Sequence, residues 1–338
     1  MSLEVRVLDA IEEVGRNQWN HVVEGADLSC VYHRYGWLRA VEDGTEYEPN
    51  HVVVFKKNNP IGILPNFITD LGPIPRLSSL RPGFGGPAIL SDEEKVLKLL
   101  LEAIPDLCTG RILYNELRTY DLGYVRYHKL LKNRGYESVI RQCRFVLDLT
   151  SGWDEVFSRM DSERRRGIRR GNDQACTITE ESLDGKALST FYDRYVQVME
   201  RTDSRILSRT FFDALADFDD RVRLWSVATD GKNRGKYLYL LDREQSTLQH
   251  LFTAVTQDDF DYHAAELLHE HAIRWGIDHG FESYELRGAP ADFRNGVFRF
   301  KELFGATAVP ILVWERGRPR PALPAINLGR AAYRRFQS

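Results

Sequence analysis

The chain has 338 residues, of which 43% are hydrophobic and 28% are charged, and its formal net charge is -3. This composition is typical of a globular protein, and the length suits two domains of about 150–170 residues each. The small net charge excludes a global field that would draw the whole chain to nucleic acid or to an anionic membrane. Any anion-binding site must therefore be local.

The cysteines and the N-terminal residues bear on location. Cys30, Cys108, Cys143 and Cys176 are far apart and form no CxxC pair, which argues against a zinc site and favours a reducing environment. The first fifteen residues carry acidic side chains and no apolar stretch, so they are not a secretory signal. Because no run of about 18 apolar residues occurs, we expect no membrane span and a cytoplasmic protein.

The first half of the chain alternates strands and helices. The patterns predict a strand at 3–8, helices at 11–23 and 33–41, and a hairpin of strands at 51–55 and 61–69. A helix at 92–104, a strand at 111–117, a helix at 124–133 and a strand at 136–149 follow. Lys57-Asn58-Asn59-Pro60 lies between two apolar runs and indicates the turn of the hairpin. Ser91 or Asp92 is a candidate cap for the helix that follows the Gly/Pro-rich loop 81–87.

The second half repeats much of this order. It predicts a basic helix at 153–170, a strand at 176–180 and helices at 185–200 and 209–218. Strands at 222–229, 236–241 and 247–255 follow, and then a helix at 262–279, a strand at 283–286, a helix at 297–304 and a strand at 306–315. A repeated order suggests two duplicated α/β (α+β) domains, although many α/β chains alternate in this way. We place the domains at 1–150 and 151–320, the second with the basic connecting helix, and a Pro/Arg-rich tail at 321–338.

Four segments carry a resemblance to a known family. They are an aromatic and basic stretch at 32–39, a basic helix at 164–170, a stretch at 199–212 with Arg205 and Arg209, and the ending Gly296-Val297-Phe298-Arg299-Phe300-Lys301-Glu302-Leu303-Phe304-Gly305. In this order they resemble the FemAB branch of the GNAT superfamily. The resemblance implies two tandem GNAT-like (acyl-CoA N-acyltransferase-like) domains with mixed central sheets, and an acyltransferase that moves an aminoacyl or acyl group to an amine.

The Phe-Lys motif is the most specific of the four segments. Acyl transfer passes through a tetrahedral oxyanion, which needs a cation or an amide donor where the charge develops. The resemblance assigns this role to Phe300 and Lys301. Lys301 is the only lysine in the last hundred residues, and a compact ammonium suits a single oxyanion. The alternative is a solvated lysine on a helix.

Positive charge for an acceptor phosphate is the second implication. Arginine suits bidentate contacts to phosphate. The resemblance points to Trp37 and Arg39 in the first segment and to Arg205 in the third, with Arg209 as a neighbour; each arginine alone could equally be a surface residue. The five arginines of 164–170 repel one another unless an anion such as tRNA or a phosphorylated acceptor lies nearby.

The donor is not determined by the sequence. An acetyl-CoA enzyme usually has a glycine-containing turn that binds pyrophosphate before its central helix, whereas the corresponding residues 256–263 contain three acids and no glycine. We therefore expect no tightly bound cofactor, and either aminoacyl-tRNA or acyl-CoA as the acyl donor. The expected acceptor is a small amine, phosphorylated or sugar-linked as in a UDP-linked or lipid-linked cell-envelope precursor.

A general base is harder to assign. Glu285 and Tyr284 lie on the strand after the central helix, and His250 shares a predicted strand face with Leu248 and Phe252. The substrate itself could also supply the proton transfer. Glu266 and His269 have a metal-ligand spacing with no second copy, so we expect no metal. Two other functions stay open: a non-catalytic nucleotide-sugar or glycan-phosphate binding protein, and a CoA-dependent N-acetyltransferase.

Overall fold

The computed structural model describes residues 2–71, 74–80, 82–218 and 220–317, together with Pro324 and Leu328. The chain divides into two compact units. Unit 1 consists of residues 1–140 and 311–338, and unit 2 of residues 141–310. The predicted tail at 321–338 lies outside the described residues apart from the two isolated positions.

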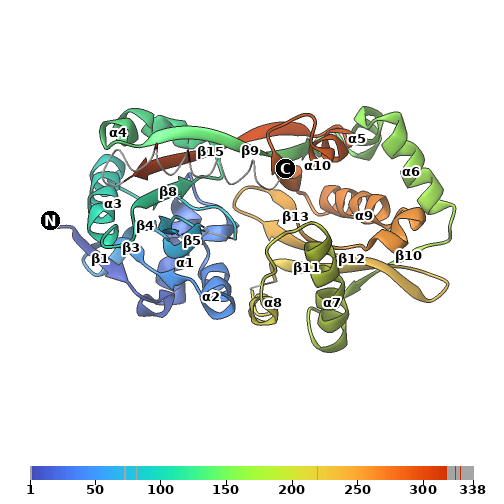
Figure 1. Cartoon of the computed structure of the whole chain (residues 1–338), viewed down its shortest axis with the longest axis horizontal. Helices are drawn as coiled ribbons and strands as arrows, with labels where there is room; N and C mark the ends of the chain where they lie inside the picture. Colours follow the sequence, from blue (N-terminus) through green and yellow to red (C-terminus); the bar gives the residue numbers. More distant parts are fainter. Residues whose placement is uncertain are drawn as a thin grey trace. The chain divides into compact units, whose positions relative to one another are not determined.

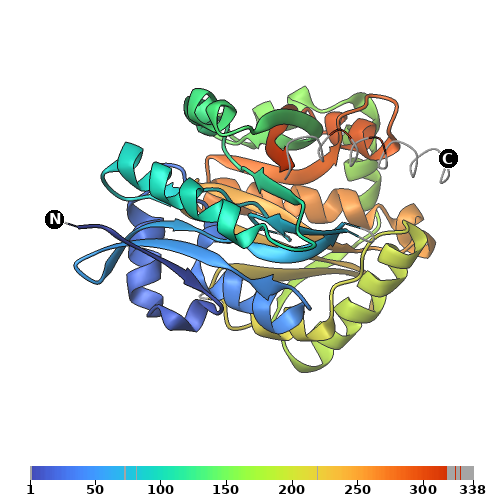
Figure 2. The same cartoon turned by 60° about the vertical axis from the view of Figure 1, so that its left-hand side comes forward.

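Unit 1 is a mixed α/β unit (Figure 1). Its helices are η1 (Ile11–Glu13), α1 (Arg16–Gly25), η2 (Val31–His33), α2 (Tyr35–Gly44), α3 (Glu93–Leu107), η3 (Leu122–Tyr127) and α4 (His128–Asn133). Its strands are β1 (Glu4–Leu8), β2 (Glu48–Pro49), β3 (His51–Lys56), β4 (Asn59–Leu64), β5 (Phe67–Leu71), β6 (Ile74–Ser78), β7 (Ala88–Ile89), β8 (Tyr114–Arg118) and the later part of β15 (Thr307–Gly317). The strand orders are β1-β3-β4-β7 and β15-β8-β6-β5-β2. Helix α3 packs its apolar face on β3 and β4, and Figure 2 shows the helix beside these strands.

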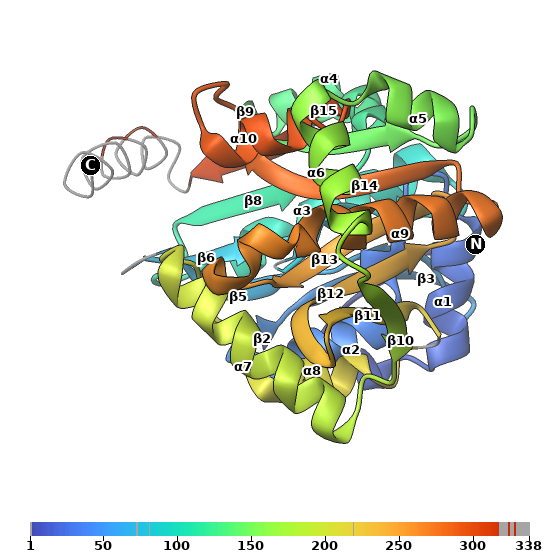
Figure 3. The ribbon, with the colours of Figure 1, turned by 90° about the vertical axis from the view of Figure 1, so that its right-hand side faces the viewer.

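Unit 2 contains α5 (Trp153–Arg159), α6 (Ser162–Asn172), α7 (Gly185–Arg201), α8 (Arg209–Leu215), η4 (Gln257–Tyr262), α9 (Ala264–Asp278) and α10 (Gly296–Glu302). Its strands are the later part of β9 (Glu137–Asp148), β10 (Thr177–Glu181), β11 (Val222–Thr229), β12 (Lys232–Asp242), β13 (Thr247–Ala254) and β14 (Ser283–Pro290). The strand order is β10-β11-β12-β13-β14-β9. Figure 3 shows α9 on one face of this sheet and α7 on the other. The main core of the unit lies between the sheet and α9.

Each unit has the same plan, which confirms the predicted pair of mixed-sheet domains. Antiparallel strands lead to one parallel pair, β6–β8 in unit 1 and β13–β14 in unit 2. A helix, α3 or α9, lies between the two parallel strands in the sequence, as a crossover between parallel strands requires. A closing antiparallel strand then pairs with β8 or β14.

The closing strands explain where the structural boundaries fall. Residues 141–148 of β9 belong to unit 2, and residues 311–317 of β15 belong to unit 1. The divisions at 140/141 and 310/311 therefore fall within strands, whereas the sequence placed boundaries at 150 and 320, after those strands. Residue patterns mark where a strand ends but not which sheet it joins.

The turn chemistry follows the sequence. Lys57 and Asn58 connect β3 to β4 with φ angles of 52° and 63°. Asp230 and Gly231 connect β11 to β12 with φ angles of 52° and 71°. Two residues with positive φ are what a two-residue hairpin with right-handed strand twist needs. The predicted turn between β3 and β4 is confirmed, and the turn between β11 and β12 has the same form.

The predicted basic helix at 153–170 is two helices. Met160 has extended angles (φ -64°, ψ 146°) and ends α5. The Asp161 side chain then accepts a hydrogen bond from the Glu163 amide at 2.7 Å and caps α6. Helical periodicity continues through the break, so only the cap residue marked it in the sequence.

Replacing Asp161 with Ala should remove this cap and lower the free energy of unfolding by about 1 kcal/mol. Asp161→Asn is the matched control, because an amide oxygen can still accept the bond, and it should cost much less. Urea unfolding of the three proteins measures the difference. Equal loss in both variants would contradict a capping role.

Candidate active site

The two parallel strands of unit 2 pair over only part of their length. Residues 247–249 of β13 pair with residues 283–285 of β14, although the strands continue to Ala254 and Pro290. A register shift breaks the β12–β13 ladder after Leu238, and another breaks the β14–β9 ladder between Glu285 and Gly288. Such irregularities bend a strand and leave backbone groups that need other partners. The diverging halves of β13 and β14 are therefore a place where side chains complete the hydrogen bonding.

Arg287 connects the diverging strands. Its φ of 61° puts a non-glycine residue in the left-handed region, which is uncommon inside a strand and costs energy that functional sites often store. The guanidinium donates to the Leu251 carbonyl on β13 and lies 5.1 Å from the Phe252 ring centroid. A fixed positive charge is thus held on the diverging part of the sheet.

Lys301 is the second cation at this place. Asn295 caps α10 by accepting from the amides of residues 297 and 298, and α10 presents Lys301 to β14. The partly buried ammonium donates to the Gly288 carbonyl, with the two atoms 2.8 Å apart. Burial and the Arg287 charge lower the pKa of Lys301 to about 7, while Glu285 and Cys143 act in the opposite direction.

Glu285 is the buried acid beside the two cations. Its side chain is fully buried, and its Oε2 accepts a hydrogen bond from Arg144 Nη1 at 3.0 Å. A buried carboxylate needs such a partner, and removing the partner is costly. This ion pair makes Glu285 a source of local negative charge held by β9, rather than a carboxylate poised only for proton abstraction.

Aromatic and imidazole rings cover the α9 side of the site. His269 Nδ1 lies 2.5 Å from the Tyr284 hydroxyl, and the Phe300 ring centroid is 6.2 Å from that of His269. The guanidinium of Arg164 lies 4.9 Å from the Phe300 centroid. Burial, followed by the Lys301 charge, lowers the pKa of His269 to about 3. His269 is therefore neutral at pH 7.

His250 also belongs to this ring cluster. It stacks on Tyr237 with centroids 4.2 Å apart, and burial followed by His269 lowers its pKa well below the ordinary value. Within the described residues, the buried Nε2 of His250 has no hydrogen-bond partner. The predicted strand face was wrong in one respect: Phe252 packs with Phe212 of α8, on the opposite side from His250. The bulge shifts the alternation of β13, and nothing in the sequence marked it.

The other predicted substrate-binding residues lie elsewhere. In unit 1, Arg39 pairs with Glu12 and Asp43, and Trp37 is fully buried with its Nε1 donating to the Pro82 carbonyl. This contact makes Trp37 part of the unit 1 core. In unit 2, Arg209 pairs with Asp213 and bonds Ser189 Oγ, and Arg205 lies in the exposed segment between α7 and α8. The structure thus gathers Lys301, Phe300, Tyr284 and Glu285 on α10 and β14 and does not place Arg209 on these elements.

The turn before α9 is acidic and internally paired. The buried Asp259 in η4 forms ion pairs with Arg194 and with Arg234. His263, with φ 53°, is the residue before α9 and gives no side-chain cap. Acidic side chains at a helix N-terminus satisfy its dipole and repel a pyrophosphate. Over the described ranges, no group of three His, Cys, Asp or Glu side chains is placed to hold a metal ion.

Comparisons with known proteins agree with this geometry. Residues 158–302 match the family described as acetyltransferase (GNAT) domain. The chain is similar to the solved structure of FemX, with a TM-score of 0.71 at 12% identity, covering 93% of this chain and 97% of that chain. It is also similar to the C-terminal domain of a putative lysylphosphatidylglycerol synthetase from Agrobacterium fabrum (TM-score 0.59, 13% identity, 93% and 94% covered). A tandem GNAT protein from the clavulanic acid biosynthesis pathway is similar too, with a TM-score of 0.57 at 12% identity, covering 94% of this chain and 98% of that chain. No curated protein sequence matches the chain.

The matched acetyltransferase (GNAT) segment supports acyltransferase activity, and it contains β13, β14 and α10, which carry the site. The chain's two units of like plan give it the fold of FemX and of the tandem GNAT protein, the fold that the resemblance implied. None of the helices in the described part of the chain is both long enough and apolar enough to cross a membrane.

The lowered pKa of Lys301 should make stability depend on pH. In the unfolded chain the lysine keeps its ordinary pKa near 10.5, and in the folded protein it titrates near 7. Between these values the unfolded chain binds more protons, so the free energy of unfolding should rise with pH. Urea unfolding from pH 7 to pH 10 should show this rise, up to about 4 kcal/mol, in wild type relative to Lys301→Met. The exposed Lys186→Met is the control, and parallel curves for wild type and Lys301→Met would contradict the assignment.

Proposed function

We propose that this protein transfers an acyl or aminoacyl group to the amine of a small acceptor, with the Lys301 ammonium stabilising the oxyanion. The observation that carries this proposal is the position of Nζ. It is partly buried on the diverging part of β14 and gives one hydrogen bond to Gly288. An ammonium has three donors, which leaves two for a developing oxyanion.

The chemistry follows from acyl transfer. The amine nitrogen attacks the acyl carbon, a C–N bond forms, and the carbonyl pair moves to the oxygen. That oxygen would lie against the Lys301 ammonium in a site where water is largely excluded and a charge interaction is stronger than in solution. The carbonyl reforms as the bond to the leaving group breaks, and the proton lost from the amine ends on the leaving group or in solvent.

The neighbouring groups suit this role. Arg287 opposes a full positive charge on Lys301, so the ammonium gains most when negative charge appears beside it. His269 and His250 are neutral near pH 7 and do not add to the repulsion. A second role for the same residue follows from its pKa near 7: the neutral amine could accept the proton of the substrate amine. The pH dependence separates these two roles.

We further propose aminoacyl-tRNA rather than acyl-CoA as the donor. The turn at η4 does not favour a pyrophosphate, because the exposed acids Asp258 and Asp261 precede α9. Helix α6 instead offers Arg166, Arg169 and Arg170 as exposed cations, which suit a polyanionic donor. The similar lysylphosphatidylglycerol synthetase is named for an aminoacylated product. This name agrees with an aminoacyl group as cargo.

For the acceptor we propose a phosphorylated or sugar-linked amine of the cell-envelope type. Arg205 is an exposed guanidinium beside α7 in unit 2, and Arg209 shares its charge with Asp213. Arg39 is a third candidate, in unit 1, where Glu12 and Asp43 already pair with it. UDP-linked and lipid-linked sugars provide the phosphates that such arginines bind.

Lys301→Ala should reduce kcat/KM about 100-fold, because an oxyanion donor is lost. Charged tRNA and acyl-CoA donors are first screened against UDP-sugar and lipid-linked acceptors, with products detected by mass spectrometry. The first transfer reaction found in this screen then serves as the assay. With wild type, kcat/KM should fall as the pH rises through about 7, because the ammonium is deprotonated. Lys186→Ala, at an exposed position of α7, is the matched control.

Two results would contradict this role for Lys301. Activity of Lys301→Ala equal to that of wild type would remove it from the reaction. A rise in kcat/KM through pH 7, absent in Lys301→Arg, would assign it as a base instead. Stabilisation by acceptors without any product in the full screen would favour a binding protein without turnover.

The donor proposal has a separate test. Charged tRNA should raise the melting temperature of the protein, and 1 mM acetyl-CoA should leave it unchanged. Combining Arg166→Ala, Arg169→Ala and Arg170→Ala should weaken tRNA binding and reduce its salt dependence, because phosphate contacts release counterions. The triple change Arg6→Ala, Lys95→Ala and Lys98→Ala, at exposed cations of unit 1, is the control. Clear stabilisation by acetyl-CoA would instead support a CoA-dependent acetyltransferase.

A further inference from the structure

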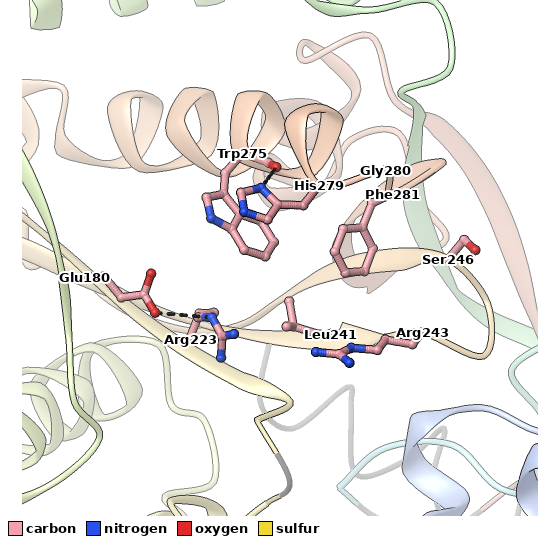
Figure 4. Close-up of a pocket in the computed structure, with 9 residues that line it drawn as sticks. All are labelled: Glu180, Arg223, Leu241, Arg243, Ser246, Trp275, His279, Gly280 and Phe281. Atoms are coloured by element: carbon pink, nitrogen blue, oxygen red, sulfur yellow. Dashed lines mark hydrogen bonds and ion pairs between the residues drawn. The ribbon is translucent and has the colours of Figure 1, made fainter.

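Unit 2 contains a pocket of about 540 Å³ that is separate from the Lys301 site. The residues that line it come from the end of β10, the start of β11, the end of β12 with the turn to β13, and the C-terminal end of α9 with the residues that follow it (Figure 4). Phe281 lines the pocket just before β14, whereas Gly288, the partner of Lys301, lies near the other end of that strand. The five residue steps from Ser283 to Gly288 span about 17 Å of strand. The pocket and the candidate active site are therefore at opposite ends of β14.

Aromatic rings form one wall of the pocket. Trp275 and His279 stack with centroids 3.8 Å apart and an interplanar angle of 14°, and Phe281 lies 5.8 Å from Trp275. The stack is held in place because His279 Nδ1 donates to the Trp275 carbonyl at 2.8 Å. Figure 4 shows the three rings on the side of the pocket opposite Leu241. Such a fixed aromatic wall suits a flat ring, which can stack at little cost in side-chain entropy.

Two arginines lie on the opposite wall. Arg223 pairs with Glu180 at 3.2 Å, so its charge is largely balanced. Arg243 is exposed in the turn after β12, and no ion pair or hydrogen bond of its side chain occurs among the described residues. Figure 4 shows Arg223 and Arg243 on either side of Leu241, across from the rings. The side chains of the pocket thus carry a surplus of one positive charge.

The end of α9 does not cancel this charge. The carbonyls of a helix C-terminus would repel an anion if they were unpaired. Here the Phe281 amide bonds to the Gly276 carbonyl and the Gly280 amide to the Ile277 carbonyl. Gly280 has a φ of 76°, as the residue that ends a helix in this way requires. Several of the last carbonyls of α9 are thereby satisfied within the chain.

The chemistry of the two walls selects the ligand. A cation is disfavoured, because Arg243 has no acidic partner and the Glu180 charge is balanced. A purely apolar ligand would bury a guanidinium without a partner, which is costly. A neighbouring pocket beyond the same ion pair is lined by Glu180, Glu181 and Asp220 and is acidic. The aromatic side is therefore the place where an anion can lie.

We propose that this pocket binds a planar aromatic molecule carrying an anionic group. Its ring would stack against the Trp275–His279 wall, and its phosphate or carboxylate would pair with Arg243. The volume lies within the range of small-molecule sites. The inference is independent of the transfer reaction, because no residue of the Lys301 site lines the pocket.

The test uses four probes and the full chain. Adenosine 5′-monophosphate and phenyl phosphate carry both a ring and a phosphate, adenosine carries a ring without the charge, and inorganic phosphate carries the charge without a ring. The readout is the indole resonance of Trp275 in a nitrogen–proton correlation spectrum, identified with Trp275→Phe. The two complete probes should shift this resonance with dissociation constants at least tenfold lower than those of adenosine and phosphate.

Variants then localise the binding. Arg243→Ala, in an exposed turn, should weaken the complete probes about tenfold, because a charge-assisted contact is lost. Arg6→Ala, at an exposed arginine of unit 1, should leave binding unchanged. Three results would overturn the proposal: no saturable shift of the Trp275 resonance, equal affinity for phosphate and for the complete probes, or no effect of Arg243→Ala.

Discussion

The hydrogen bond from Lys301 to the Gly288 carbonyl is the interaction on which the proposed chemistry depends. It is possible because β13 no longer pairs with β14 at Gly288, since that ladder ends at Gln249 and Glu285. A fully paired strand would have used that carbonyl in the sheet, and the ammonium would have had no fixed acceptor. Two irregular strands thus create an oriented cation in a region that the rest of the unit keeps rigid.

The charges around Lys301 decide what it can do. Arg287 and burial make its protonated form less stable, whereas the buried Glu285 makes it more stable, and the balance brings the pKa to about 7. Arg144 holds Glu285 in turn, so β9 takes part in the electrostatics of a site displayed on β14 and α10. Perturbed groups gathered in this way are typical of functional sites. The neutral His250 and His269 line the same region without adding charge.

The two proposals place different anion chemistry at the two ends of one strand. At the Gly288 end of β14, the proposed reaction brings the cations beside an oxygen on which negative charge develops only during the transfer. At the Ser283 end, a fixed aromatic wall and Arg243 suit a ligand that is already charged. The same sheet supplies both, because strands β11 to β14 present different residues at their two ends.

The sequence by itself determined most of the longer helices and strands of both units, the hairpin turn after β3, and Lys301 and Phe300 as the central candidates. Those features are local, since they depend on periodicity, turn residues and one short motif. Tertiary structure alone decided that residues 141–148 and 311–317 join sheets formed by the other half of the sequence. It also decided the bulges that turn His250 away from Phe252 and Arg287 toward Leu251. Strand partners and bulges are set by pairing between distant residues, for which a single sequence carries no periodic signal.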